Sequence, residues 1–319
     1  MTRFAPEGYR INSYENKNAL ENESSLIQAK YLGKILEAKA ILCDSNHNLI
    51  VDLGFIQGII PREETAIGIY EGSVKDIAII SRVNKPVCFV ITNFEKDGDK
   101  IKKAILSRRI AQEICFENKI SKLSPGDIID ATVTHMENFG AFVDIGCGIV
   151  SFLPIDMISV SRINHPNERF KNGMKIKVIV KSVIDNRVNL THKELLGTWE
   201  ENANSFSIGE TVTGTVRSIE NYGIFVELTP NLAGLAEPKE GIFEGQQISV
   251  YIKNIIPDKM KVKLVIIETF ETKNKVKNPK YFINNSHIDK FIYSPTVCKR
   301  IIETDFTKNL VNVQNSAIS

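Results

Sequence analysis

Long apolar runs, paired cysteines and a strong charge of one sign are all absent from this 319-residue chain. Its hydrophobic content of 43% and charged content of 24% are ordinary for a globular protein. No window approaches the roughly 18 uninterrupted apolar residues of a membrane helix, and residues 1–25 lack the apolar core of a signal peptide. We therefore expect a cytoplasmic protein with no membrane partner.

Residues for metal binding and catalysis are scarce and scattered. No CxxC pair occurs, and the histidines are not grouped with cysteines or carboxylates at metal-ligand spacing. No glycine-rich phosphate loop or nucleophile motif is present. The sequence predicts free, mostly buried thiols, no metal, no cofactor, no small-molecule substrate and no enzymatic activity. The residues concerned are Cys43, Cys88, Cys115, Cys147 and Cys298, and His47, His135, His165, His192 and His287.

The overall charge is almost balanced, with 40 Lys and Arg against 38 Asp and Glu and a formal net charge of +2. A chain of this kind is not attracted to a polyanion as a whole. Any binding of nucleic acid must therefore come from local patches.

One nine-residue phrase occurs twice. ENFGAFVDI spans Glu137–Ile145 and ENYGIFVEL spans Glu220–Leu228, an offset of 220 minus 137, or 83 residues. A repeat at this spacing indicates one small folding unit that was copied. An average of roughly 100 to 200 residues per domain allows two or three domains in this chain, and the offset favours three.

The alternation within the phrase predicts where its side chains point. In a strand, Ala141, Val143 and Ile145 share the inner face, while Phe142 and Asp144 share the outer one. The copy repeats this arrangement, with Phe225 outward beside Glu227. Repeated aromatic residues on an outer face suggest a surface on which bases stack, whereas the alternative is ordinary core packing.

Strand patterns around the phrase predict a mainly β fold: three tandem five-stranded barrels of the OB type, joined by short helical linkers. Gly140 and Gly223 stand at equivalent places, where we expect a bulge that re-aims the preceding Phe139 or Tyr222. For the second barrel the expected strands are Ile128–Met136, Gly140–Ile145, Ile149–Pro154, Ile176–Ile184 and Arg187–His192. For the third they are Thr211–Glu220, Gly223–Leu228, Gly234–Glu237, Gln247–Ile256 and Lys261–Glu268.

A degenerate first barrel is predicted from strand-like runs between Ile35 and Ser107, among them Ala78–Val83. Aligning Leu49–Gly54 with Ala141–Gly146 puts His47 and Ile50 at the aromatic positions. The resulting division is residues 1–28, a leader or attachment segment with a short helix near Leu26–Leu36; 29–120, the first barrel with a linker helix over 108–122; 124–196, the second barrel; 207–270, the third; and 271–319, a basic and aromatic tail with no readable period. A second helical linker is expected over Lys193–Phe206.

Basic residues alternate with the apolar residues of several predicted strands. Cations beside exposed rings suit a flexible single-stranded polyanion, although an alternating lysine strand is also a common solvated face. The candidates are Lys175, Lys177, Lys181 and Arg187 in the second barrel, and Lys253, Lys261 and Lys263, with the aromatic Tyr251, in the third.

These residues resemble a known family. Gly126–Gly146, followed by RVNLTHKELLGTWEENANSFSIGETVTGTV, is similar to consecutive RNA-binding domains of the bacterial small-subunit ribosomal protein S-one, in its short form from firmicute-type bacteria. The resemblance extends over about residues 30–268 and is strongest over 124–236. Ribonucleases and other RNA factors carry the same module.

The resemblance implies which residues contact RNA. In the second barrel these are Phe139, Phe142, Asp185 and Arg187. In the third they are Tyr222 and Phe225, with Lys261 at the arginine position. The family's histidine at the end of the third strand is replaced by Pro61, Pro154 and Glu237 in the three barrels. Glu237 places a negative charge in the groove of the third barrel, and the first barrel lacks the aromatic residues, so the second barrel is the best expected RNA binder.

Two functions from different classes follow. The first is a non-catalytic binder of single-stranded mRNA in translation, with the small ribosomal subunit as partner. The alternative is an accessory subunit of an RNA-decay or stress complex, in which the first barrel docks a protein. An enzyme with cryptic nuclease activity is a third reading.

Overall fold

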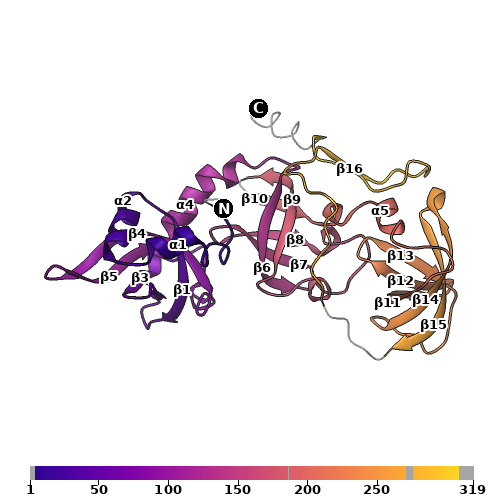
Figure 1. Cartoon of the computed structure of the whole chain (residues 1–319), viewed down its shortest axis with the longest axis horizontal. Coiled ribbons are helices and arrows are strands. Elements are labelled where there is room, and N and C mark those ends of the chain that lie inside the picture. Colours follow the sequence, from indigo (N-terminus) through magenta and orange to yellow (C-terminus); the bar gives the residue numbers. More distant parts are fainter. Residues whose placement is uncertain (1–3, 186, 271–275, 309–319) are drawn as a thin grey trace. The chain divides into compact units, whose positions relative to one another are not determined.

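The computed structural model describes residues 4–185, 187–270 and 276–308. By internal contacts the chain forms two compact units. The N-terminal unit comprises residues 1–123 with 144–150, and the C-terminal unit comprises 124–143 with 151–319. Figure 1 gives the element labels used below.

The first barrel lies in the N-terminal unit and closes in the strand order β1-β2-β3-β5-β4. Its strands are β1 (Leu36–Cys43), β2 (Leu49–Asp52), β3 (Gln57–Ile60), β4 (Pro86–Asp97) and β5 (Lys100–Ser107). The helical segments of this unit are α1 (Tyr14–Ala19), α2 (Glu23–Tyr31), η1 (Arg62–Glu64), α3 (Ile77–Ile80), α4 (Arg108–Asn118) and η2 (Ile120–Lys122).

The second barrel closes in the order β10-β8-β7-β6-β9, which is the same cyclic order as in the first. Its strands are β6 (Ile128–Glu137), β7 (Gly140–Gly146), β8 (Ile149–Pro154), β9 (Lys175–Ile184) and β10 (Arg187–Thr191), with η3 (Ile155–Met157) and η4 (Pro166–Glu168) between β8 and β9. Ala141, Val143 and Ile145 are buried, so their predicted inward orientation is confirmed.

The third barrel closes as β11-β12-β13-β15-β14. Its strands are β11 (Thr211–Glu220), β12 (Gly223–Thr229), β13 (Leu232–Ala236), β14 (Gln247–Ile256) and β15 (Lys261–Phe270), with η6 (Pro257–Lys259) before the last. The linker before it contains η5 (Lys193–Leu196) and α5 (Trp199–Ala203) rather than one helix. Gly197 separates the two at φ +87°, where a Cβ would also collide with the Phe282 ring. The fold is therefore mainly β with five-stranded closed barrels, as predicted.

Three local predictions are wrong. Ala78–Val83 is not a strand: α3 begins at Ile77, and Ile77 and Ile80 are exposed while Ile79 is buried, so the apolar run follows a helical period. The helix predicted near Leu26–Leu36 ends at Tyr31, because Gly33 takes a left-handed conformation and Leu36 opens β1. In the third barrel the bulge lies in β11, between Val216 and Ser218, and not at Gly223.

The described part of the first 28 residues is folded into the N-terminal unit. Ala19 and Leu26 join the core of the first barrel, as does Ala29 directly after this segment. Buried Glu7 receives hydrogen bonds from the Nε of Arg108 at 2.6 Å and from the backbone N–H of Cys88 at 3.0 Å. Burial works against the charge of Glu7, but Arg108 and Arg82 outweigh it and hold the pKa of this carboxyl below its usual range.

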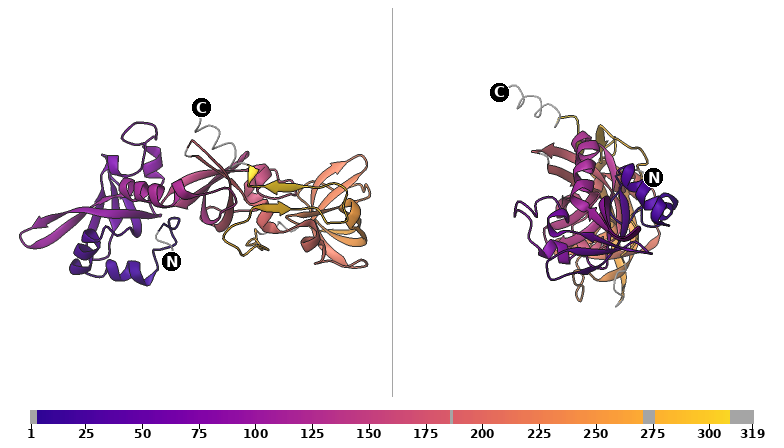
Figure 2. Two further views of the ribbon diagram at one scale, coloured as in Figure 1. Left: turned by 90° about the horizontal axis from the view of Figure 1, so that it is seen from above. Right: turned by 90° about the vertical axis from the view of Figure 1, so that its left-hand side faces the viewer.

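The tail also has structure within its described residues. Strands β16 (Lys290–Ile292) and β17 (Glu303–Asp305) pair antiparallel and run side by side in Figure 2. Phe291, Tyr293 and Phe306 are buried in the same core as the third barrel and Trp199. The polar pattern of the tail hides this because its few large side chains are far apart in sequence.

Within the described ranges, no helix has both the length and the apolar content needed to cross a bilayer. Four of the five cysteines are buried and Cys43 is half-buried, and all five are free thiols.

Candidate nucleic-acid interface

Three phenylalanine rings meet on the outside of the second barrel. Phe139, in the turn between β6 and β7, is 58% exposed. Its ring centroid lies 6.3 Å from that of Phe142 at an interplanar angle of 90°, and 5.6 Å from that of Phe152 on β8. Phe142 and Phe152 lie 5.3 Å apart. The predicted pair is therefore part of a larger aromatic group.

The third barrel repeats the geometry of the pair. Tyr222 is 66% exposed, and its ring lies 6.2 Å from that of Phe225 at 90°. Phe225 stands opposite Leu235 of β13, and Leu235 stands beside Lys263 of β15. Phe225, Leu235 and Lys263 therefore form one row across three neighbouring strands, which we call the aromatic row, and this row includes a lysine.

The first barrel has aliphatic side chains at the corresponding register positions. Ile50 of β2 stands opposite Leu42 of β1 and Ile59 of β3, and Ile59 stands beside Ile105 of β5. These side chains have no flat π-face on which a base can stack. His47, aligned with Phe139, lies in a turn at φ +62°.

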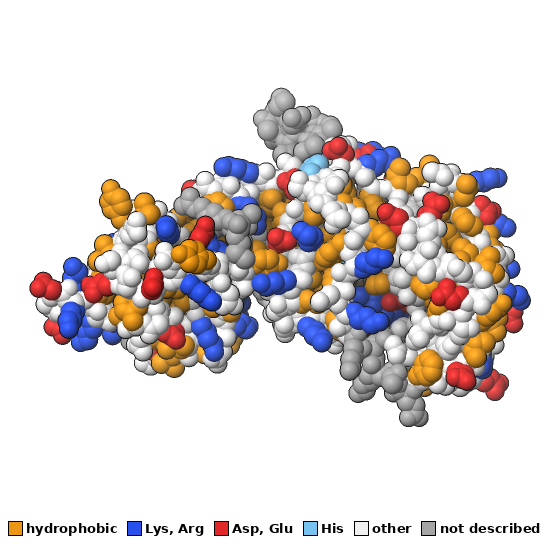
Figure 3. Space-filling model, viewed as in Figure 1, with side chains coloured by type: hydrophobic (Ala, Val, Ile, Leu, Met, Phe, Trp, Pro, Cys, Tyr) orange, Lys and Arg blue, Asp and Glu red, His pale blue; other side chains and the backbone are white. Residues whose placement is uncertain are grey.

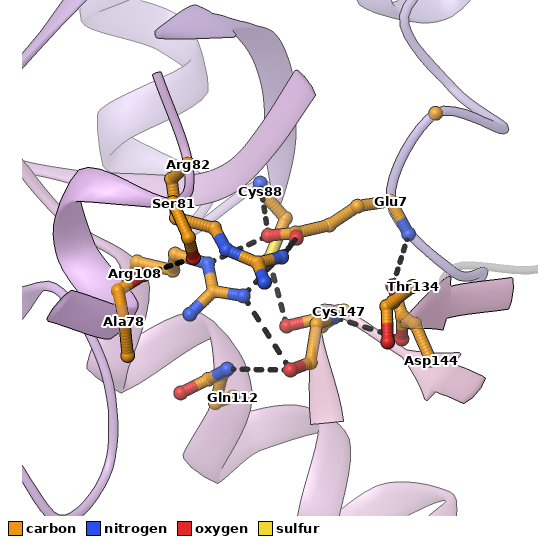
Figure 4. A network of polar contacts seen from close by, with 12 residues as sticks. Glu7, Ala78, Ser81, Arg82, Cys88, Arg108, Gln112, Thr134, Asp144 and Cys147 are labelled. Atoms are coloured by element: carbon orange, nitrogen blue, oxygen red, sulfur yellow. Dashed lines mark hydrogen bonds and ion pairs between the residues drawn. The ribbon is translucent and has the colours of Figure 1, made fainter. Parts of the chain in front are cut away.

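The prediction that Asp144 lies on an exposed outer face is wrong. Asp144 is buried, and its carboxylate accepts hydrogen bonds from the backbone N–H groups of Glu7 at 2.7 Å, Gly146 at 2.8 Å and Gly148 at 3.0 Å (Figure 4). Strand alternation does not reveal this because it assigns a face without showing what covers it.

The same prediction is wrong for Glu227, which is buried beside two arginines. It accepts hydrogen bonds from Nε of Arg217 at 2.7 Å and from Nη2 of the same residue at 3.2 Å, and it also pairs with Arg169 from the segment before β9. Arg217 pairs in turn with Glu168. These four charges join the second and third barrels inside the C-terminal unit, so Glu227 is occupied by structural contacts.

The predicted lysines of β9 lie at different places along the strand. Lys177 pairs in register with Asp130 near the start of β6, and its ammonium is 3.2 Å from the Asp130 carboxylate. Lys175 pairs with Thr132 in the middle of β6, three residues before His135. Lys181 lies farther along β9, with its Nζ 3.5 Å from the sulfur of Met157.

The turn between β9 and β10 is nearer to the rings. Asp185 is exposed at φ +49°, and Arg187 is exposed at the start of β10. Asn189, on the same face two residues later, is in register with Phe152 and donates a hydrogen bond to Ser182 at 2.9 Å. Arg187 can therefore hold a phosphate of a strand whose bases lie on the rings.

In the third barrel the predicted residues lie at two different ends of the sheet. Lys263 reaches the aromatic row, and exposed Lys261 opens β15 after Met260, which has φ +48°. Tyr251 pairs with Thr211 at the other end of the sheet, and exposed Lys253 lies at the bulge between Ile252 and Asn254.

Sequence reasoning missed two rings, His135 and Phe152. The His135 ring stacks against Phe142 at 6.2 Å and 22°. Phe152 lies at an outward position of the predicted strand Ile149–Pro154, so the alternation argument applied to the repeated phrase would have identified it. His135 lies before the phrase and gave no comparable signal.

The chain as a whole is not strongly basic, with a formal net charge of +2. The face in Figure 3 carries Lys and Arg side chains interspersed with Asp and Glu. In the described part of the chain, no three or more His, Cys, Asp or Glu side chains are grouped to hold a metal ion. The arrangement supports stacking with local phosphate contacts.

The chain is similar in sequence to known RNA-binding and ribosomal proteins. Residues 122–193 match the family model described as the S1 RNA binding domain. The chain is similar to the small ribosomal subunit protein bS1 homolog of Bacillus cereus, at 27% identity over 80% of this chain and 69% of the relative. It is also similar to the small ribosomal subunit protein bS1 homolog of Bacillus subtilis, at 30% identity over 70% of this chain and 60% of the relative.

Among solved structures, it is similar to a multidomain protein with nucleic acid binding domains from Streptococcus pneumoniae, at 14% identity over 75% of each chain and a TM-score of 0.26. The chain spans between 60% and 69% of the length of the two Bacillus relatives.

Proposed function

We propose that this chain, in which residues 122–193 match the S1 RNA binding domain, is a non-catalytic binder of single-stranded mRNA that acts in translation with the small ribosomal subunit. The observation that carries the proposal is the aromatic pair at the same place in two barrels, with ring centroids 6.3 and 6.2 Å apart and both pairs at 90°.

Exposed rings bind unpaired bases because every base has a flat π-face, and each stack is worth roughly 1 to 3 kcal/mol. Arg187 in the second barrel and Lys263 in the third supply cations for the phosphates that connect those bases. Such contacts are largely indifferent to base identity, which suits a protein that handles many messages.

The barrels have unequal roles in this proposal. The second barrel (124–196) is the main RNA binder and the third (207–270) is a weaker one. The first (29–120) binds no RNA, because aliphatic side chains occupy its corresponding row. No metal or cofactor takes part, and the protein works in the cytoplasm, where its ribosomal relatives would meet mRNA.

The proposal is tested by replacing Phe139 and Phe142 with Ala. Removing two rings worth at least 1 kcal/mol each should weaken binding of an unstructured RNA oligomer about 30-fold or more. Replacing Ile50 and Ile59 with Ala in the first barrel is the matched control and should leave the affinity unchanged. Affinity should also fall with salt, at a log-log slope of about −0.7 for each phosphate neutralised. An unchanged affinity in the Phe139/Phe142 variant would refute the stacking surface.

The aliphatic row of the first barrel keeps the second candidate function open. Leu42, Ile50, Ile59 and Ile105 form an apolar surface of the kind that docks protein, as an accessory subunit of an RNA-decay or stress complex requires. Sedimentation of cell extract at low salt separates the two functions. Co-migration with small ribosomal subunits supports the first, and migration in a different complex supports the second.

A further inference from the structure

We propose that His135 is an additional RNA-contacting ring of the second barrel, and that the residue at its position makes the second barrel a stronger RNA binder than the third. This inference rests on the proposed function and adds to it a residue outside the repeated phrase.

Strand register identifies equivalent positions in the three barrels. In the first barrel Leu42 stands opposite Ile50, and in the third Ser218 stands opposite Phe225. In both, the residue follows a bulge in the first strand of the barrel. The 83-residue offset carries Ser218 to position 135 and Phe225 to position 142. The position next to the second ring is therefore Leu42, His135 or Ser218, and a ring occupies it in the second barrel alone of the three.

The His135 ring is exposed and lies nearly parallel to the Phe142 ring. Its side chain is 59% exposed, and its plane is within 22° of the plane of Phe142, with the centroids 6.2 Å apart. The charged group beside it is Glu137, whose carboxylate oxygen lies 2.6 Å from Nε2 of the imidazole. That contact is at the edge of the ring and leaves its face available for a base.

The aromatic group of the second barrel thus offers surfaces in two orientations. Phe142 and His135 are nearly parallel, while Phe139 stands at a right angle to Phe142. A strand that places one base on Phe142 reaches His135 or Phe139 with a neighbouring base. The third barrel has the perpendicular pair but no ring at the third place, because the Ser218 hydroxyl offers no face for stacking.

A purely structural role for His135 is disfavoured by the other two barrels. Leucine and serine fill the same register position in closed barrels of the same strand order, so closure does not need an imidazole there. The exposure of the side chain also means that its removal leaves no large cavity.

The test exchanges residues between barrels in the full chain. His135→Ser gives the second barrel the third barrel's residue, and Ser218→His makes the reverse change. Fluorescence anisotropy with a labelled unstructured RNA oligomer should show His135→Ser weakening binding roughly 5- to 150-fold, the equivalent of one stack of 1 to 3 kcal/mol. Ser218→His should strengthen binding, and His135→Phe should keep the wild-type affinity.

Leu42→Ser at the same register position of the first barrel is the matched control and should change nothing. Unfolding monitored by Trp199 fluorescence checks that the variants of the second and third barrels are folded, and a circular-dichroism melt does the same for Leu42→Ser. A gain of affinity in Ser218→His cannot arise from misfolding. The inference is overturned if His135→Ser stays within twofold of wild type or if Ser218→His gains nothing, while the Phe139/Phe142 variant loses affinity. If that aromatic variant also binds RNA normally, the proposed function itself has failed.

Discussion

Acid should weaken the C-terminal unit through one buried histidine, His192. Its Nδ1 lies 2.8 Å from the carbonyl oxygen of Ile158, which is an acceptor, so Nδ1 carries the proton. Its Nε2 then accepts a hydrogen bond from the hydroxyl of Tyr281 at 3.3 Å, and the same hydroxyl oxygen receives the backbone N–H of Lys177 at 2.9 Å. This chain of three bonds fastens the tail to the second barrel and requires a neutral imidazole.

The magnitude follows from the pKa. Burial, with the positive charge of Arg169 adding to it, lowers the pKa of His192 from 6.5 to about 4. A histidine whose folded pKa is depressed contributes stability that is fully present above the unfolded pKa. That stability is lost as the pH falls from about 6.5 toward 4. At 1.36 kcal/mol for each pH unit, the loss reaches about 3 kcal/mol when complete and about 2 kcal/mol at pH 5.

The assay is denaturant unfolding at pH 7.5, 6.5, 5.5 and 5, followed by fluorescence. Trp199 is the single tryptophan of the chain and is buried in the core of the C-terminal unit, so its emission reports that unit. The variant His192→Asn removes the titrating group while its amide still reaches the Ile158 carbonyl. Carboxylates titrate in both proteins, so the difference between them isolates His192.

We expect the free energy of unfolding of the wild type, relative to His192→Asn, to fall by about 2 kcal/mol between pH 7.5 and 5. Tyr281→Phe, which leaves the histidine buried, should keep this pH dependence and cost about 1 kcal/mol at every pH. Parallel pH profiles for wild type and His192→Asn would refute the reasoning.

Three further predictions concern stability. Phe306→Ala, in the tail, should lower the free energy of unfolding by roughly 3 to 5 kcal/mol, because that buried ring packs with the third barrel; Trp199 fluorescence measures this, and a loss below 1 kcal/mol would contradict it. Glu7→Gln should cost roughly 3 to 5 kcal/mol by leaving Arg108 buried without its carboxylate, as a circular-dichroism melt would show. Gly148→Ala should lower the free energy of unfolding of the N-terminal unit, because Gly148 has φ +76° and a Cβ there would lie 1.8 Å from a guanidinium nitrogen of Arg108. Gly72→Ala is the control for backbone strain alone, since Gly72 has φ +73° and open space around it.

Much of the fold was readable because its signals are local. The strands from Ile128 to Glu268 alternate with period two, and the 83-residue repeat shows that one pattern was used more than once. Phe142 was found for the same reason, since neighbouring residues on one strand fix which side chains share a face. Phe139 was found from its place before Gly140 in the repeated phrase and from the family resemblance.

The errors and omissions arise where distant residues decide. Asp144 and Glu227 occupy the predicted strands, yet the N–H of Glu7 and the guanidinium groups of Arg169 and Arg217 cover them. The tail has no period because it folds by inserting single side chains into a core built by other segments.

The sequence by itself therefore determined the strand pattern, the repeat and the aromatic pair, because these depend on spacing along the chain. Only the tertiary structure decided which rings and charges join that pair. Strand pairing brings His135 and Phe152 to Phe142 in the second barrel and Lys263 to the row of Phe225 in the third, while it places Lys177 beside Asp130. Pairing between different strands sets those neighbours, and spacing within one strand does not encode it.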